Sequence, residues 1–181
     1  MATAQQDAVA LLKADHRKVE SLFEQYEKAR STDRKLALAK EICTELTVHT
    51  IIEEEIFYPA CAEKVEEDAL DEAYVEHDGA KVLIAEIAGS GPDQPFYDAK
   101  VSVLSEEIKH HVKEEERRSE GLFAKAKAAG LDMDALGARL AARKKELLAQ
   151  IKASGLPNPE TRSFTGHKLV QKSPVGASQA A

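Results

Sequence analysis

Apolar side chains recur at steps of three and four residues along four long stretches of the chain, which is the period of an amphipathic α-helix. These stretches cover approximately residues 4–29, 33–64, 68–88 and 93–122, and a shorter one covers 133–153. Only 9 glycines and 6 prolines occur among the 181 residues. Because turn formers are scarce, a few long helices are favoured over many short strands. The sequence therefore predicts an all-α protein.

Short connections join the four long helices, which is typical of an antiparallel up-down-up-down four-helix bundle. Ser31 begins a polar run that offers a turn and an N-cap for the second helix, and Asp132 offers an N-cap for the fifth. Pro59 is expected to bend or loosen the last turn of the second helix. The short fifth helix is expected to lie against one end or side of the bundle. Residues 1–153 form this predicted domain, and residues 154–181, rich in Ser, Pro, Gly, Thr and Gln, are predicted to be a flexible C-terminal tail.

The charge of the chain limits its partners. A formal net charge of −7 argues against nucleic-acid binding, because such proteins present a basic face to phosphate. No apolar run is long enough to cross a membrane and no leader is visible, so we expect a cytoplasmic protein with reduced cysteines and no membrane partner. From Arg143 onward the chain carries seven basic and two acidic side chains. This basic end either solubilises the chain or contacts an acidic protein partner.

A histidine interrupts each of the four long apolar stripes near the middle of its helix. In an antiparallel bundle, the distances of these histidines from the turns place all four rings within two or three helical turns of one level. Two stripes add a glutamate four residues later, which stacks both side chains on one helix face. The candidate site residues are His16, His49, Glu53, His77, His111 and Glu115.

Such a cluster would be costly if it were buried without partners, because an isolated carboxylate in an apolar core loses its solvation or takes up a proton. Imidazole nitrogens and carboxylate oxygens suit iron, manganese or zinc, and facing helices of bundles build di-metal sites from such donors. A single core histidine satisfied by a hydrogen bond is the ordinary alternative. Four inward histidines with two matched carboxylates favour a metal site instead.

Neighbouring residues on a helix point about 100° apart, so only one glutamate in each run of three shares the histidine's face. Glu53 and Glu115 continue the apolar stripes, and Glu116 is a substitute one step further round. The glutamates expected in solvent are Glu54, Glu55 and Glu114. His110 also has a glutamate four residues later, but the stripe leads to His111. We therefore expect His110 behind the ligands or at the surface.

These motifs resemble the hemerythrin-like (HHE cation-binding) family over about the first 130 residues. The resemblance rests on Leu-Leu-Lys-Ala-Asp-His16, on His49-x-x-x-Glu53 followed by Glu-Glu-Ile-Phe-Tyr-Pro, on Glu76-His77, and on His110-His111-Val-x-Glu-Glu115-Glu. It implies a four-helix bundle with a non-haem centre of two iron ions, ahead of manganese or zinc, that meets dioxygen, peroxide or nitric oxide. By position, the resemblance implies the terminal ligands His16, His49, His77 and His111 and the bridging carboxylates Glu53 and Glu115.

The third helix departs from the oxygen-carrying members of that family, which bring two histidines four residues apart. Here Ala73 precedes His77 and Lys81 follows it at that spacing. One iron therefore lacks a ligand unless water, Glu76 or Tyr74 fills the position or it stays open. This departure favours a site that senses or reacts with a small ligand over plain oxygen storage, and it is compatible with a weak peroxidase or oxidase-type activity.

Two functions stay open at this point. The first is a di-iron protein that binds or senses a small oxygen or nitrogen species in oxidative or iron stress. The second is a metal-dependent interaction module whose basic tail contacts an acidic protein when the site changes state. Deletion of residues 154–181 separates the two, because metal spectra are expected to persist in both cases and partner capture is lost only in the second.

Overall fold

The computed structural model of this chain describes residues 6–62, 64–65, 67–166 and 170, and in that part of the chain it contains helices and no strand. The elements in chain order are α1 (Ala8–Lys28), α2 (Thr32–Ile52), the π-helical segment η1 (Glu53–Phe57), α3 (Tyr58–Cys61), α4 (Glu67–Ala88), α5 (Tyr97–Glu115), α6 (Leu122–Ala128) and α7 (Met133–Ser154). The prediction of an all-α fold is confirmed.

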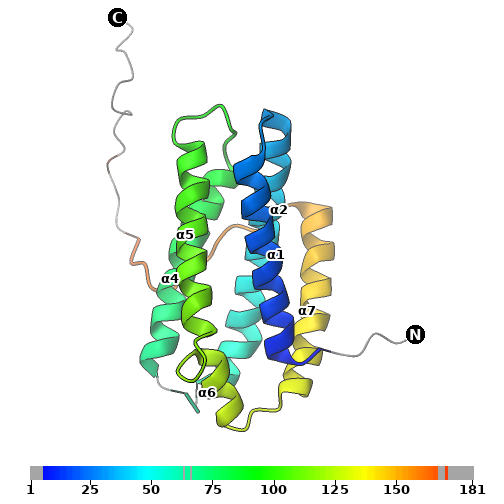
Figure 1. The fold of residues 1–181 in the computed structure, drawn as a ribbon, viewed down its shortest axis with the longest axis vertical. Coiled ribbons are helices and arrows are strands. Elements are labelled where there is room, and N and C mark those ends of the chain that lie inside the picture. Colours follow the sequence, from blue (N-terminus) through cyan, green and yellow to red (C-terminus); the bar gives the residue numbers. More distant parts are fainter. Residues whose placement is uncertain (1–5, 63, 66, 167–169, 171–181) are drawn as a thin grey trace, which may run out of the picture.

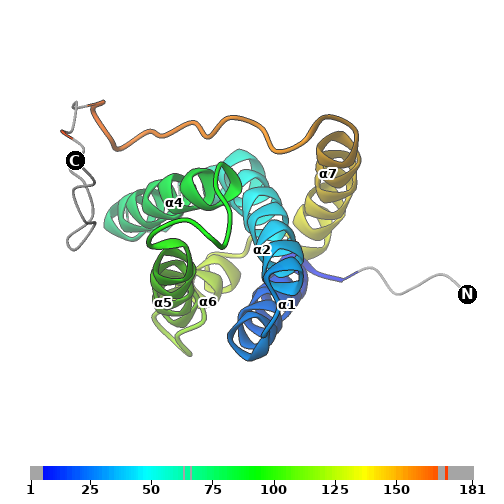
Figure 2. The ribbon, with the colours of Figure 1, turned by 90° about the horizontal axis from the view of Figure 1, so that it is seen from above.

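Helices α1, α2, α4 and α5 run side by side in alternating directions and form the predicted bundle (Figure 1). Helix α7 lies outside this bundle against α1 and α2, and α6 closes its lower end (Figures 1 and 2). Leu136, Leu140 and Leu147 of α7 are buried in the same apolar cluster as Leu12 of α1. The fifth predicted helix therefore lies along one side of the bundle, where its apolar face is removed from water.

Side-chain caps fix where three of the helices begin. Asp7 accepts a hydrogen bond from the backbone N–H of Ala10 at 2.7 Å, so α1 begins at Ala8 instead of near residue 4. Ser31 caps α2 and Asp132 caps α7, as predicted. Each cap satisfies one of the N–H groups that the first helical turn leaves without an internal partner.

The predicted fourth helix is too long. Helix α5 ends at Glu115, the chain turns over residues 116–121, and Leu122 begins the separate helix α6. A Cβ atom on Gly121 would lie 2.4 Å from the carbonyl oxygen of Glu115, so this tight turn requires glycine. Leu122 is nevertheless buried, which is why the apolar pattern continued through the turn and concealed it.

The predicted second helix is continuous in direction but not in hydrogen bonding. Helix α2 ends at Ile52, and the N–H of Tyr58 then bonds to the carbonyl of Glu53, five residues back. Pro59 follows immediately and has no N–H for the carbonyl of Glu55, so a regular α-helical ladder cannot be kept here. The loosened turn expected at Pro59 is this π-helical segment.

Two apolar cores lie at the two ends of the bundle. The lower core contains Leu12, Phe57 and Phe123, and the upper core contains Phe23 and Leu104. The candidate site residues lie between them. His16 and His77 stand near the middle of α1 and α4, as expected. His49 and Glu53 instead lie at the end of α2 and the start of η1, and His111 and Glu115 lie in the last turns of α5. Both cores hold the four helices together, so the polar layer between them is positioned by apolar packing on either side.

After α7 the chain crosses the bundle. Residues 155–163, which we call the strap, run from the end of α7 past α2 to α4 (Figure 2). Arg162 and Ser163 donate hydrogen bonds to Asp78 of α4. Residues 167–169 and 171–181 lie outside the described part of the chain, and the division at residue 153 stays a prediction.

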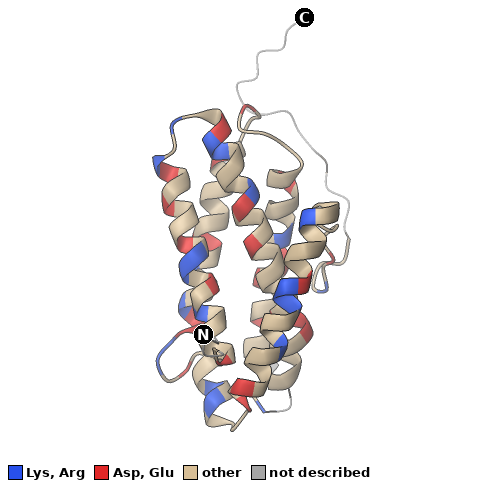
Figure 3. Ribbon diagram, turned by 90° about the vertical axis from the view of Figure 1, so that its right-hand side faces the viewer, with Lys and Arg blue, Asp and Glu red and all other residues tan. Residues whose placement is uncertain are grey.

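Acidic and basic residues are interspersed along the helices (Figure 3). Among the described residues, no helix is long and apolar enough to cross a bilayer.

Candidate metal centre

The four predicted histidines meet inside the bundle as two pairs. His16 Nε2 lies 3.1 Å from His49 Nε2, and His77 Nε2 lies 3.3 Å from His111 Nε2. Each residue is only 1–4% exposed. In a neutral imidazole, one of the two nitrogens is unprotonated and carries a lone pair. These contacts therefore bring several lone pairs toward one point.

The two predicted carboxylates join the histidine pairs. Glu53 Oε2 lies 3.1 Å from His49 Nε2 and 3.4 Å from His77 Nε2, so it spans one member of each pair. Glu115 Oε2 lies 3.5 Å from both His16 Nε2 and His111 Nε2 and spans the other two members. The structure therefore brings all six candidate residues together, and their role as ligands stays a prediction.

Two overlapping sets of ligand atoms result from this arrangement. His16, His49, Glu53 and Glu115 form one set, and Glu53, His77 and His111 form the other; within each set, the atoms lie within 4.8 Å of one another. Glu53 belongs to both sets. Such histidine and carboxylate clusters are able to hold a metal ion, and the shared carboxylate places two such positions side by side.

Tyr58 is a further member of the cluster that sequence reasoning missed. Its buried hydroxyl lies 3.1 Å from His77 Nε2 and donates to Glu115 Oε1 at 3.1 Å. Burial, followed by the charges of Glu115 and Glu53, raises the pKa of the Tyr58 hydroxyl well above its ordinary value. The signal was present in the Phe-Tyr-Pro run after Glu53, but only the π-helical turn directs this side chain inward.

The outer nitrogen of each histidine faces a second carboxylate. Glu116 lies 2.8 Å from His16 Nδ1, Glu54 lies 3.1 Å from His77 Nδ1, and Glu76 lies 2.7 Å from His111 Nδ1. Asp15 Oδ2 lies 3.7 Å from His49 Nδ1. Carboxylates in these places favour the tautomer with the proton on Nδ1. The lone pair of Nε2 then points toward the centre and is free to bind a metal ion.

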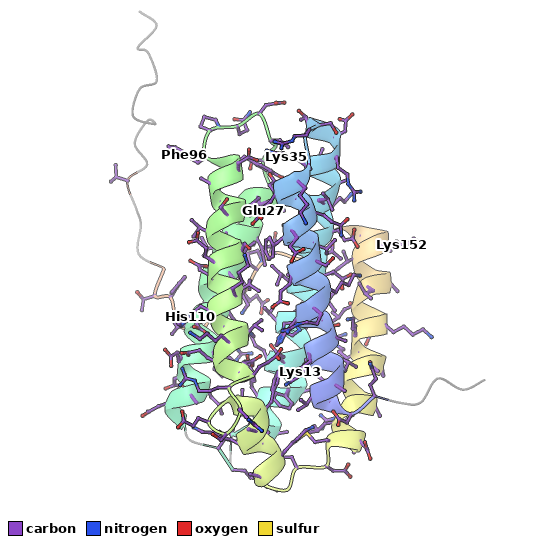
Figure 4. The ribbon with its side chains drawn as sticks, in the orientation of Figure 1. Lys13, Glu27, Lys35, Phe96, His110 and Lys152 are labelled. Carbon is purple, nitrogen blue, oxygen red and sulfur yellow. The ribbon has the colours of Figure 1, made fainter. Side chains whose placement is uncertain are left out.

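This outer layer corrects two sequence-based expectations. Glu54 was expected in solvent but is buried, because the π-helical segment turns it toward His77. Glu76, one of the residues considered for the missing third-helix ligand, instead hydrogen-bonds to the outer side of His111. His110 does point away from the bundle, with a side chain that is 61% exposed (Figure 4).

Cations in turn hold three of the outer carboxylates. Arg17 donates to Glu116 at 2.8 Å, Lys144 donates to Asp15, and Lys81 lies 2.7 Å from Glu54. Burial would raise the pKa of Asp15 and of Glu54, but bonds from His49 and His77, with the two lysines, lower both below their ordinary values. Asp15 and Glu54 are therefore held in the ionised form beside a centre that itself has no lysine or arginine among its members.

Burial and neighbouring charges shift the pKa values of the inner histidines and carboxylates in different directions. Burial lowers the pKa of His16 to about 2, and the charge of His49 adds to this shift. Burial also raises the pKa of Glu115, with Glu53 adding to the shift, whereas His49 and His77 outweigh burial and lower the pKa of Glu53. Burial thus works against the deprotonated form of the Glu115 carboxyl, which is the form that binds a metal ion.

Orphaned polar atoms give an independent test of whether a cation fits. Glu53 Oε1 and Glu115 Oε2 are fully buried and have no hydrogen-bond partner among the described residues. A buried carboxylate oxygen without a donor is costly, and buried polar groups in native proteins are almost always satisfied. Both atoms belong to the residues that span the histidine pairs, so divalent cations would satisfy them there.

An apolar wall lines one side of the histidines and leaves little space. A cavity of about 10 Å³ lies beside the four histidines and is bounded by Val19, Leu46, Ile108 and Val112. That volume is about the size of one water molecule. On the lower side, the ring of Phe123 stacks on His16 at 5.8 Å between centroids. These apolar side chains leave room for only a very small molecule beside the histidines.

A helical bundle with a buried cluster of histidines and shared carboxylates defines a metal-binding bundle protein. Residues 7–123 match the family model of the hemerythrin HHE cation binding domain. The chain therefore belongs to this family, and the resemblance seen in the sequence is confirmed.

Two individual proteins are similar to this chain. The crystal structure of a hemerythrin HHE cation binding domain-containing protein from Mycobacterium kansasii superposes with a TM-score of 0.68 at 23% identity, covering 83% of this chain and 95% of that one. A DNA nickase from Nostoc sp. (strain PCC 7120 / SAG 25.82 / UTEX 2576) is 28% identical over 106 residues, which is 59% of this chain and 30% of the nickase. The chain thus spans under a third of that relative's length.

Proposed function

We propose that this protein holds two iron ions in a non-haem centre and binds or senses dioxygen, peroxide or nitric oxide. The observation that carries the proposal is the pair of carboxylates, Glu53 and Glu115, each of which spans one histidine of each pair at 3.1–3.5 Å. Carboxylates shared between facing helices are how bundles hold two ions side by side. Membership of the hemerythrin HHE family supports iron over manganese or zinc.

Each donor has a stated role in this proposal. The four histidines supply Nε2 atoms; outer carboxylates orient His16, His77 and His111 by accepting from Nδ1, and Asp15 faces Nδ1 of His49 at 3.7 Å. Glu53 and Glu115 supply the shared oxygens and offset the positive charge. When bound, iron supplies a redox-active Lewis acid that polarises a small ligand.

Tyr58 completes the site on the side of α4. The second histidine expected of an oxygen carrier is replaced by Ala73, and the Tyr58 hydroxyl lies 3.1 Å from His77 Nε2. This contact supports Tyr58, ahead of Glu76 or Tyr74, as the group that takes the position. From this position the Tyr58 hydroxyl donates a proton or a hydrogen bond to a small molecule bound beside His77. This role favours sensing or reaction over plain oxygen storage.

The apolar cavity supports a diatomic or similarly small ligand. Its volume of about 10 Å³ and its walls of Val19, Leu46 and Ile108 admit a molecule of that size and exclude larger substrates. Exclusion of bulk water also strengthens the electrostatic interactions of the buried donors. The alternative of an interaction module relies on the basic tail, residues 154–181. Residues 167–169 and 171–181 of that tail lie outside the described part of the chain, so the alternative stays a prediction.

Metal analysis and an optical spectrum of the aerobically purified protein test the proposal. We expect two iron ions per chain and absorption in the near ultraviolet, where ferric centres absorb and zinc is silent. Exposure of the reduced protein to nitric oxide should change that spectrum. Zinc in place of iron, or a full complement of iron in both His49→Ala and Glu53→Ala, would contradict the proposal.

A further inference from the structure

A network of buried charges lies behind His77. Glu54 accepts from His77 Nδ1 and pairs with Lys81, which also donates to Asp78 Oδ1 at 3.1 Å. All three charged residues are buried, and Asp78 is 0% exposed. Burying two carboxylates and one ammonium is tolerated only where each has its partners.

The strap supplies the partners that this network lacks within the bundle. Three donors from the strap converge on Asp78 Oδ2: the N–H of Arg162 at 2.7 Å, the N–H of Ser163 at 2.7 Å and the Ser163 hydroxyl at 2.8 Å. The carbonyl of Glu160 accepts from Lys81 Nζ at 3.0 Å. The Arg162 guanidinium lies over the ring of Tyr74, 5.4 Å from its centre.

Loss of the strap would therefore unbalance charges next to a candidate ligand. Asp78 would lose all the donors to one of its oxygens, and Lys81 would lose one of its three acceptors. Leaving buried charges without partners is costly, so the network would rearrange or admit water. Glu54 shares Lys81 with Asp78, so its hold on His77 Nδ1 would change as well.

The other histidine pair is independent of the strap. His16 is backed by Glu116 and Arg17, and His49 faces Asp15, which Lys144 of α7 holds. Among the described contacts, none of these residues bonds to the strap. Any effect of the strap should therefore fall on one half of the centre.

We propose that residues 155–163 position His77 through Asp78, Lys81 and Glu54, so that docking of the strap sets how tightly the set Glu53, His77 and His111 holds its cation. The inference rests on the proposed di-metal function. Partners behind a ligand histidine typically change metal affinity 10–100-fold. The proposal also predicts the opposite of the sequence-based expectation that deleting residues 154–181 leaves the metal spectra unchanged.

Ser163→Pro is the sharpest variant, because it removes two of the three donors to Asp78 from an exposed residue and leaves the bundle intact. Thr165→Pro is the matched control, since Thr165 is exposed and makes no hydrogen bond among the described contacts. Truncations after Ser154 and after Gly166 form a second pair, of which only the first removes the strap.

The first measurement is release of iron to a ferrous chelator from the reduced, loaded protein. We expect wild type, Thr165→Pro and the truncation after Gly166 to release both ions slowly. Ser163→Pro and the truncation after Ser154 should release one of the two ions at least tenfold faster. Unchanged release, or equal acceleration of both ions, would overturn the proposal. If the shorter truncation does not fold, Ser163→Pro decides.

The second measurement needs no metal and separates this proposal from the proposed function. In the metal-free protein, ¹⁵N spectra of the imidazoles report the hydrogen bond of His77 Nδ1. We expect that signal to move in Ser163→Pro and to stay in place in Thr165→Pro, with the His16 and His49 signals unchanged in both. A wild-type protein that binds no iron would contradict the proposed function alone, whereas a His77 signal that is indifferent to Ser163→Pro would contradict the role of the strap.

Discussion

The hydroxyl oxygen of Tyr58 lies 3.1 Å from Nε2 of His77, on the inner side of the histidine ring. The same ring is held from its outer side by Glu54, so His77 is fixed between groups that both come from the segment after α2. One widened helical turn places them there. In a regular α-helix, residues 54 and 58 would lie on one face, whereas the π-helical segment lets them approach His77 from two sides.

Tyr58→Phe tests the contribution of this hydroxyl. We expect the variant to fold, because the ring keeps its packing against His77 and Tyr74. Loss of the hydroxyl removes the donor to Glu115 and a neighbour of His77, so the optical spectrum of the iron-loaded protein should change. The spectra of wild type and variant at equal iron content provide the measurement.

Tyr74→Phe is the control for that experiment, since its ring contacts Tyr58 and the strap but no inner ligand. It should leave the spectrum as in wild type. Identical spectra for all three proteins would remove Tyr58 from the centre.

The adjacent histidines at 110 and 111 provide a matched pair of substitutions. His111 is buried at the centre, while His110 is exposed on the same helix turn. We expect His111→Ala to lower the iron content below one and a half ions per chain and His110→Ala to keep two, because only the first removes an inner donor. Metal analysis after gel filtration measures the difference, and equal losses in the two variants would contradict the assignment of ligands.

Periodicity was sufficient to predict the bundle and the six inner side chains. His16 and His77 stand at mid-helix positions of regular α-helices, where the step of 3.6 residues gives the facing side directly. The apolar residues on either side of them continue each stripe, so the faces that meet in the core could be read from spacing alone.

Local departures from α-helical geometry account for what the sequence did not reveal. Tyr58 and Glu54 enter the site because Pro59 prevents a regular ladder, and a spacing rule that assumes 100° per residue places both wrongly. The strap was missed for another reason. Asp78 and Ser163 are far apart in the sequence, and a charge buried by a distant segment leaves no periodic pattern.

Asp98 should make the metal-free protein sensitive to acid at the upper end of the bundle. Bonds from Lys35 and then from Tyr26 lower the pKa of Asp98 below its ordinary value of 3.8. A carboxyl whose pKa is lower in the folded protein adds stability above about pH 3.8, and that stability is lost as the pH falls through the folded-state pKa. The Asp98 side chain is 57% exposed, so the contribution is about 1 kcal/mol at most.

Asp98→Asn should therefore lower the free energy of unfolding at pH 7, and the difference from wild type should shrink toward pH 3. Urea unfolding of chelator-treated protein at pH 7, 5 and 3 measures it. Asp93→Asn, at an exposed residue of the neighbouring loop, should show no such dependence. A constant difference across this range would mean that Asp98 acts through packing and not through its charge.

Gly137 is required where α7 meets the beginning of α1. A Cβ atom there would lie 2.4 Å from the carbonyl oxygen of Gln6 and 2.9 Å from the backbone nitrogen of Ala8, and backbone atoms cannot rotate away. Helix propensity alone favours alanine by about 1 kcal/mol, but the overlap forces the two helices apart. We expect Gly137→Ala to destabilise the protein by about 1–3 kcal/mol.

Gly79→Ala is the control, because a Cβ atom on Gly79 meets only the Glu107 side chain at 3.8 Å. Thermal unfolding should show a lower midpoint for Gly137→Ala and an equal or higher one for Gly79→Ala. Equal gains in both variants would show that α7 does not approach α1 this closely.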